Sequence, residues 1–103
     1  MNDVIDSERM ALHSAQAARL LKSLANEKRL QILCCLHEQE LSVGELNARI
    51  DLSQSALSQH LALLREEGLV GTRREAQTIY YRLLPGPARA LIQTLHSLYC
   101  AES

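Results

Sequence analysis

The residues best suited to covalent or metal chemistry in this chain are its three cysteines. Cys34 and Cys35 are adjacent, and Cys100 stands near the end of the sequence. An odd number of cysteines, two of them neighbours, is not typical of a secreted disulfide framework. In a reducing compartment, such thiols are inert packing groups, metal ligands or redox sensors.

Two histidines widen this choice of chemistry. His37 follows Cys34 by three residues and His96 precedes Cys100 by four, which puts each pair on one face of a helix. One interpretation is a tetrahedral zinc site with two sulfur and two nitrogen ligands, from Cys34, His37, His96 and Cys100. The other is that both imidazoles pack or face solvent near the thiols.

A cluster of small, neutral polar side chains occupies the segment 53–67. On a helical wheel, Leu57, Leu61 and Leu64 share one face, and His60 flanks that face, where we expect it to pack. The opposite face and the start of the helix carry hydrogen-bonding groups suited to base edges and phosphates, namely Gln54, Ser55, Ser58 and Gln59. The alternative is a solvated face that is rich in Ser and Gln by chance.

A basic pair follows in an alternating segment. Arg73 and Arg74 lie in the first half of a predicted hairpin over residues 70–83, and Gln77 lies at its tip. Paired arginines on a hairpin can grip phosphates or enter a minor groove, so we assign all three residues to DNA contact. The alternative is a charged edge that protects the hairpin from aggregation.

The elements that position these residues are mostly helices. Periodicity and caps predict helices over about 9–24, 26–39, 41–50, 53–67 and 87–100, with the hairpin between the last two. A short helix, a tight turn, a capped helix and a wing make a winged helix-turn-helix, a mainly α (α+β) fold. We expect residues 1–8 to form a flexible tail and residues 9–103 to form one domain.

Composition narrows the class of protein. Leu and Ala are the most frequent residues. Because the net charge is only -1, a DNA-binding face must be a local basic patch.

The terminal helices carry wide apolar faces, which predicts a homodimer through them. No apolar run suits a membrane, the acidic N-terminus is wrong for a signal peptide, and we expect a cytoplasmic protein. No catalytic triad, phosphate loop or carboxylate pair indicates an enzyme.

Several segments resemble the ArsR/SmtB family of bacterial repressors. The match covers about residues 15–100 and is most specific at Leu52–Leu61, with Asn26–Leu33 and Ile79–Tyr81 in support. A narrower resemblance is to the HlyU-, BigR- and SqrR-like branch, carried by Leu30–Cys34, Leu41–Leu46, Glu75–Gln77 and Leu98–Cys100. The family implies a homodimer, an inverted-repeat operator in double-stranded DNA and repression relieved by an inducer.

The narrower branch also implies a role for the cysteines. Cys34 and Cys100 match its dithiol pair, so the resemblance predicts a switch operated by reactive sulfur species or an oxidant, with no cofactor. Cys35 receives no essential role. The residues at the family's two metal sites are missing, since Ser42–Gly44 and Arg89–Gln93 contain no Cys, His or acidic ligand. A zinc-responsive repressor and an interaction module without DNA binding remain as alternatives.

Overall fold

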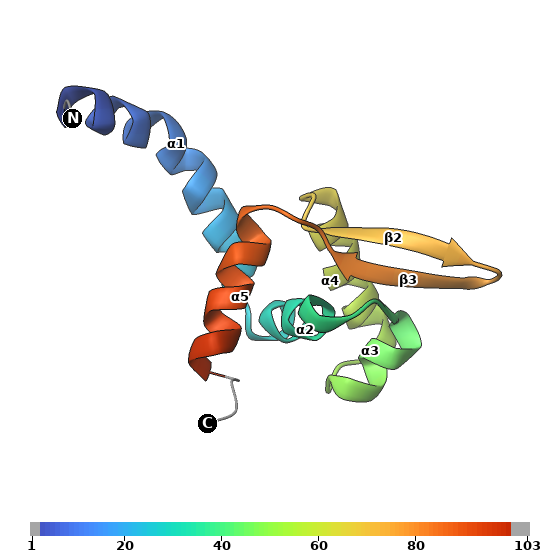
Figure 1. The fold of residues 1–103 in the computed structure, drawn as a ribbon. Helices are drawn as coiled ribbons and strands as arrows, with labels where there is room; N and C mark the ends of the chain where they lie inside the picture. The colour runs from blue at the N-terminus through green and yellow to red at the C-terminus, as the bar shows by residue number, and fades with distance from the viewer. Residues whose placement is uncertain (1–2, 100–103) are drawn as a thin grey trace.

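The structure is a computed structural model that describes the backbone of residues 3–99 and the side chains of residues 7–99. Within these residues there are five helices and three strands, arranged as a winged helix-turn-helix (Figure 1). The order is α1 (Asp3–Leu24), α2 (Glu27–Glu38), β1 (Leu41–Ser42), α3 (Val43–Arg49), α4 (Gln54–Glu66), β2 (Val70–Glu75), β3 (Thr78–Leu83) and α5 (Pro87–Tyr99). The predicted fold class is confirmed.

Local caps set the helix boundaries. The Asn26 side chain accepts a hydrogen bond from the Arg29 backbone at 3.0 Å and begins α2. Ser42 and Glu45 form a complete capping box at the start of α3. After α4, Gly68 adopts a φ of 76°, a left-handed conformation that favours glycine and stops the helix. These caps stand where the sequence predicts them.

Two boundaries differ from the expectation. Helix α1 begins at Asp3 rather than near Arg9, so most of the predicted tail is helical. Residues 3–8 contain no Gly or Pro, and nothing in the sequence stops a helix there. Leu41 and Ser42 form a strand instead of opening α3, because Leu41 pairs with Tyr81 and is buried.

The sheet has three antiparallel strands in the order β1-β3-β2. In the hairpin, Arg73 lies opposite Tyr80, and Arg74 lies opposite Ile79. The hairpin turns through Ala76 and Gln77, between the paired residues Glu75 and Thr78. The β2–β3 pair forms the wing, which projects from the helical body (Figure 1).

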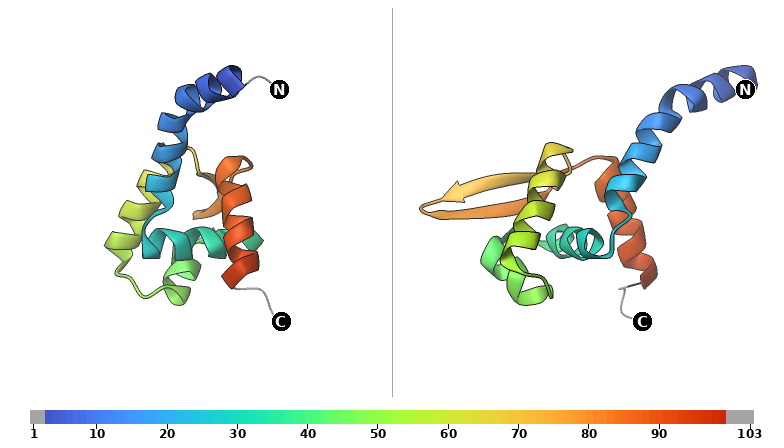
Figure 2. Two further views of the ribbon diagram at one scale, coloured as in Figure 1. Left: turned by 90° about the vertical axis from the view of Figure 1, so that its left-hand side faces the viewer. Right: turned by 180° about the vertical axis from the view of Figure 1, so that it is seen from behind.

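The core lies between α2, α3, α4, α5 and the base of the wing. It is built from aliphatic side chains, and none of the described polar or charged residues is buried. Helix α1 contributes Leu24 from its last turn, while the rest of that helix reaches away from the body (Figure 2). None of the described helices has both the length and the hydropathy of a membrane-spanning segment.

Candidate nucleic-acid interface and thiol pair

Helix α4 combines a fully buried face with an exposed polar one. Leu57, Leu61 and Leu64 are inaccessible to solvent. The predicted DNA-contacting side chains of this helix are all exposed, namely Gln54, Ser55, Ser58 and Gln59. The leucines therefore anchor the helix in the core, and its opposite face presents small hydrogen-bonding groups to solvent. This arrangement suits entry into a major groove.

The turn before α4 holds that helix at a defined angle to α3. Ser53 caps the helix by accepting a hydrogen bond from the Ala56 backbone at 3.1 Å. The Asn47 side chain on α3 donates to the Leu52 carbonyl at 2.7 Å, which closes the turn from the other side. The helix-turn-helix is thus preorganised before any ligand binds.

The two wing arginines have different surroundings. Neighbouring residues of a strand point to opposite faces, so Arg73 lies on the face of Tyr80 and Arg74 on the face of Ile79. The Arg73 guanidinium lies 2.8 Å from the Glu40 carboxylate, 2.9 Å from that of Glu75 and 4.8 Å from the Tyr80 ring centre. These two carboxylates raise its pKa, with Glu75 the larger cause.

Arg74 has no ion-pair partner among the residues that the structure describes, and its side chain is exposed. Gln77 is exposed in the turn. The structure therefore brings the polar residues of α4 together on one surface but separates the two wing arginines. Sequence reasoning missed the Glu40 contact, because Glu40 and Arg73 are 33 residues apart and meet only once β1 joins the sheet.

His60 sits at the boundary between the two faces of α4. Its side chain is half-buried, as expected for a packing residue. Burial, and secondly the nearby Arg29 cation, lower the pKa of this imidazole. Both effects favour the neutral form.

Cys34 and Cys35 lie on α2, and both pack against the edge of the core. Cys34 lines an open groove together with Ala25, Asn26, Glu27, Leu30 and Gln31. Burial raises the pKa of the Cys35 thiol, with opposing smaller effects from Arg49 and Glu38. Because the thiolate is the reactive form, burial lowers the reactivity of Cys35.

Helices α2 and α5 meet at two histidines, His37 and His96. The His37 and His96 rings lie 5.3 Å apart between centroids, and His96 Nε2 lies 3.7 Å from a Glu38 oxygen. Cys100 falls outside the described residues. Within those residues, no three Cys, His, Asp or Glu side chains come together as a group that could hold a metal ion. The alternative zinc site, which includes Cys100, stays a prediction.

Comparison with known proteins decides the family. The model of the bacterial regulatory proteins of the arsR family matches residues 26–72, which span α2 to the start of the wing. The transcriptional activator HlyU of Vibrio cholerae is 60% identical over 93 residues, covering 90% of this chain and 86% of that protein. The chain belongs to the ArsR family.

Comparison with solved structures supports the same family. The solved structure of reduced HlyU from Vibrio cholerae superimposes with a TM-score of 0.86 at 60% identity, covering 91% of this chain and 99% of that one. A homodimeric winged helix-turn-helix DNA-binding domain of a possible ArsR-family regulator from Mycobacterium bovis gives 0.74 at 33% identity, covering 87% and 83%.

A further relative shows the range of regulation in the family. The biofilm growth-associated repressor of Agrobacterium fabrum is 48% identical over 92 residues, covering 89% of this chain and 79% of that protein. This ArsR-family chain is thus a DNA-binding transcriptional regulator, and its relatives are regulators, not enzymes. The predicted family and branch are confirmed.

Proposed function

We propose that this ArsR-family regulator binds an inverted-repeat operator as a homodimer and that a Cys34–Cys100 dithiol controls its affinity. The observation that carries the DNA-binding part is the exposed face of α4, where Gln54, Ser55, Ser58 and Gln59 stand on a buried leucine base. Gln can pair with an adenine edge, and Ser with bases or phosphates. The wing supplies Arg73, Arg74 and Gln77.

The homodimer is supported by apolar side chains left uncovered on the terminal helices. Leu12 and Leu21 on α1, with Leu98 and Tyr99 on α5, are all more than half exposed. A homodimeric relative from Mycobacterium bovis has the same fold. Two-fold symmetry in the protein matches a two-fold operator, since each recognition helix then reads one half-site.

The dithiol part rests on the family branch and on the meeting of two helices. His37 is one turn beyond Cys34 on α2, and its ring lies against that of His96, four residues before Cys100. This contact brings α2, which carries Cys34, against α5, which ends one residue before Cys100 in the sequence. A solved structure of the relative HlyU is described as the reduced form.

The chemistry balances with a persulfide as oxidant. A protein thiolate attacks the outer sulfur of R–S–SH, takes up that sulfur and releases R–S⁻. The second thiolate then attacks the sulfur bound to the protein, forms the Cys34–Cys100 disulfide and expels HS⁻. Two thiols are oxidised, and the persulfide is reduced to a thiol and sulfide. Peroxide reaches the same disulfide through a sulfenic acid, with loss of water.

A bridge between these residues constrains α2 against the C-terminal end of α5. Helix α2 shares the core with α4, through Leu33 and Leu36 on one side and Leu57 and Leu61 on the other. A shift of α2 is thereby passed to the recognition helix. It changes operator affinity only if the reduced and bridged states bind DNA differently.

The test measures the intact mass of the protein and its affinity for the operator on the same samples. The reduced dimer is treated with an organic persulfide, tetrasulfide or hydrogen peroxide, and its affinity for an inverted-repeat duplex is measured by fluorescence anisotropy. We expect loss of two hydrogens, or gain of bridging sulfur, together with weaker binding. Cys34→Ser and Cys100→Ser should abolish both effects, while the matched control Cys35→Ser keeps them. A bridged protein with unchanged affinity, or a Cys100→Ser variant that still responds, would contradict the switch.

A further inference from the structure

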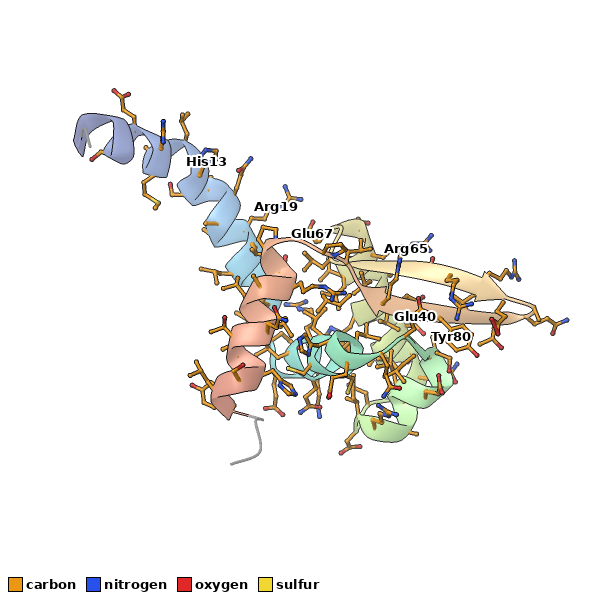
Figure 3. The ribbon with its side chains drawn as sticks, in the orientation of Figure 1. His13, Arg19, Glu40, Arg65, Glu67 and Tyr80 are labelled. Carbon is orange, nitrogen blue, oxygen red and sulfur yellow. The ribbon has the colours of Figure 1, made fainter. Side chains whose placement is uncertain are left out.

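Helix α1 is joined to the end of the recognition helix by one carboxylate. Glu67 Oε2 lies 2.9 Å from Arg19 Nη2, and Glu67 Oε1 lies 3.2 Å from Arg19 Nε. The Ser23 hydroxyl also approaches Glu67 Oε1, at 3.2 Å. Figure 3 shows Arg19 and Glu67 facing each other across this junction. A two-pronged guanidinium–carboxylate pair fixes direction as well as distance.

Stability of α4 does not explain why a glutamate stands here. Glu67 is the C-cap of α4, where the negative end of the helix dipole disfavours an anion. Its side chain is nonetheless only 17% exposed. Hydrogen bonds from Arg19 and then Ser23 hold the pKa of this carboxyl below its usual value, so it is ionised at neutral pH. The carboxylate is thus compensated from α1 and not from its own helix.

Helix α1 has few other attachments to the body. The side chains of residues 7–19 are exposed, and only the last turn is packed, through Leu20, Ser23 and Leu24. A helix of this length is ~33 Å long, and turning it by about 10° at one end moves the other end by roughly 6 Å. A contact at Arg19, beyond the packed turn, therefore limits the angle of the whole helix.

The angle matters if α1 contributes to the dimer, and in this respect the inference rests on the proposed function. Two recognition helices must lie about 34 Å apart to read successive major grooves. Glu67 stands where α4 ends, shortly before the wing strand β2 begins at Val70. A change in the angle between α1 and α4, repeated in both protomers, changes that separation.

We propose that Arg19 and Glu67 form a positioning pair that sets the spacing of the two recognition helices without touching DNA. The pair fixes the angle between the dimerisation helix α1 and the reading unit of α3, α4 and the wing. It therefore determines which separation of half-sites the dimer prefers.

The test compares two neighbouring glutamates. Glu66 is exposed and has no ion-pair partner among the described residues, so Glu66→Gln is a matched control for Glu67→Gln. Each change removes one negative charge per protomer, which alone strengthens binding to DNA. We expect Glu66→Gln to bind as well as wild type or better. We expect Glu67→Gln to bind about three- to tenfold more weakly, because the dimer loses two partly exposed ion pairs.

Operators with the half-sites moved apart or together by one base pair give the decisive readout. Wild type should prefer one spacing, while Glu67→Gln and Arg19→Ala should discriminate less. The exchange variant Arg19→Glu/Glu67→Arg should restore both affinity and preference, which a general loss of stability would not allow. Sedimentation should show a dimer in every case.

The outcomes separate this proposal from the proposed function. A wild-type protein that is monomeric, or that binds no inverted repeat, overturns both. A wild-type dimer that binds the operator, with Glu67→Gln behaving as Glu66→Gln does, overturns the positioning pair alone. So does an exchange variant that folds and dimerises but keeps the defect of the single changes.

Discussion

Three leucines on α4 and several leucines on the terminal helices occupy opposite environments in the same chain. Leu57, Leu61 and Leu64 are fully buried under the recognition helix. Leu12 on α1 is 74% exposed, and Leu98 on α5 is 70% exposed. The exposed surfaces of these helices differ as well. Helix α4 exposes polar side chains on the face opposite its buried leucines, whereas the terminal helices expose apolar side chains to solvent.

This contrast distinguishes apolar surface that a single chain buries from apolar surface that a second copy would have to bury. The reading unit buries its apolar face within the chain, so a single copy sets its fold and the positions of its exposed polar side chains. Scattered exposed leucines are ordinary on a protein surface, but a set spread along two helices is typical of an interface. The difference between the two regions therefore lies in their dependence on a second copy.

The largest expected effect tests this contrast directly. Leu61→Ala should destabilise the fold by about 2–5 kcal/mol, because it leaves a cavity in a packed core. Leu98→Ala should cost little in a separated chain, and its effect should depend on protein concentration, as expected for a residue that stabilises a dimer. Urea unfolding at two protein concentrations measures both. If Leu98→Ala costs the same at each concentration and sedimentation is unchanged, the apolar face is not the dimer contact.

The sequence predicts the reading unit well because its signals are local. A cap at Ser53, leucines at helical spacing and a stop at Gly68 all lie within sixteen residues, and each acts on its own neighbourhood. The capping box at Ser42 was predictable for the same reason. The pair β1–β3 was not, since a two-residue strand has no periodicity and exists only through pairing with Tyr80 and Tyr81.

Long-range polar contacts were also beyond the sequence. Glu40 and Arg73 are 33 residues apart, and Arg19 and Glu67 are 48 apart. Each of these residues taken alone is an ordinary surface charge, and no spacing rule connects it to its partner. Sequence reasoning therefore treated Arg73 and Arg74 as one pair, although the hairpin places them on opposite faces.

The next effect sharpens the comparison between these two arginines. Arg74→Ala should weaken operator binding and lower the slope of log affinity against log salt by about 1 for each phosphate that is no longer neutralised. Arg73→Ala should leave that slope nearer to wild type, because its guanidinium is already shared by Glu40 and Glu75. Anisotropy titrations across a salt series measure both slopes.

Gln59→Ala is the matched reference for base reading on α4. It should cost about 1–3 kcal/mol with the correct operator and leave the salt slope unchanged, since Gln carries no charge. Equal slopes for Arg73→Ala and Arg74→Ala would show that DNA displaces the two carboxylates from Arg73. Unchanged affinity of both Gln59→Ala and Arg74→Ala would show that the assigned surface is wrong.

The smallest effect concerns His60, at the border between the buried and exposed faces of α4. Burial, and then the Arg29 cation, lower the pKa of His60 below the usual 6.5, while the unfolded chain keeps the usual value. As the pH falls through about 6.5, the unfolded state binds the proton first, so folding stability decreases until the lower pKa of the folded state is passed. Above that range both states are neutral and this contribution is constant.

His60→Gln should remove this pH dependence while leaving operator affinity at pH 7.5 within about twofold of wild type, because a packing residue makes no base contact. Urea midpoints at pH 7.5 and 5.5 give the difference for each protein, and His13→Gln, at an exposed position on α1, controls for the loss of one imidazole. A His60→Gln variant that keeps the wild-type pH dependence but loses operator affinity would move His60 to the DNA-facing side. The DNA-contacting surface of α4 would then include His60, the neighbour of Gln59, although the side chain of His60 is half-buried.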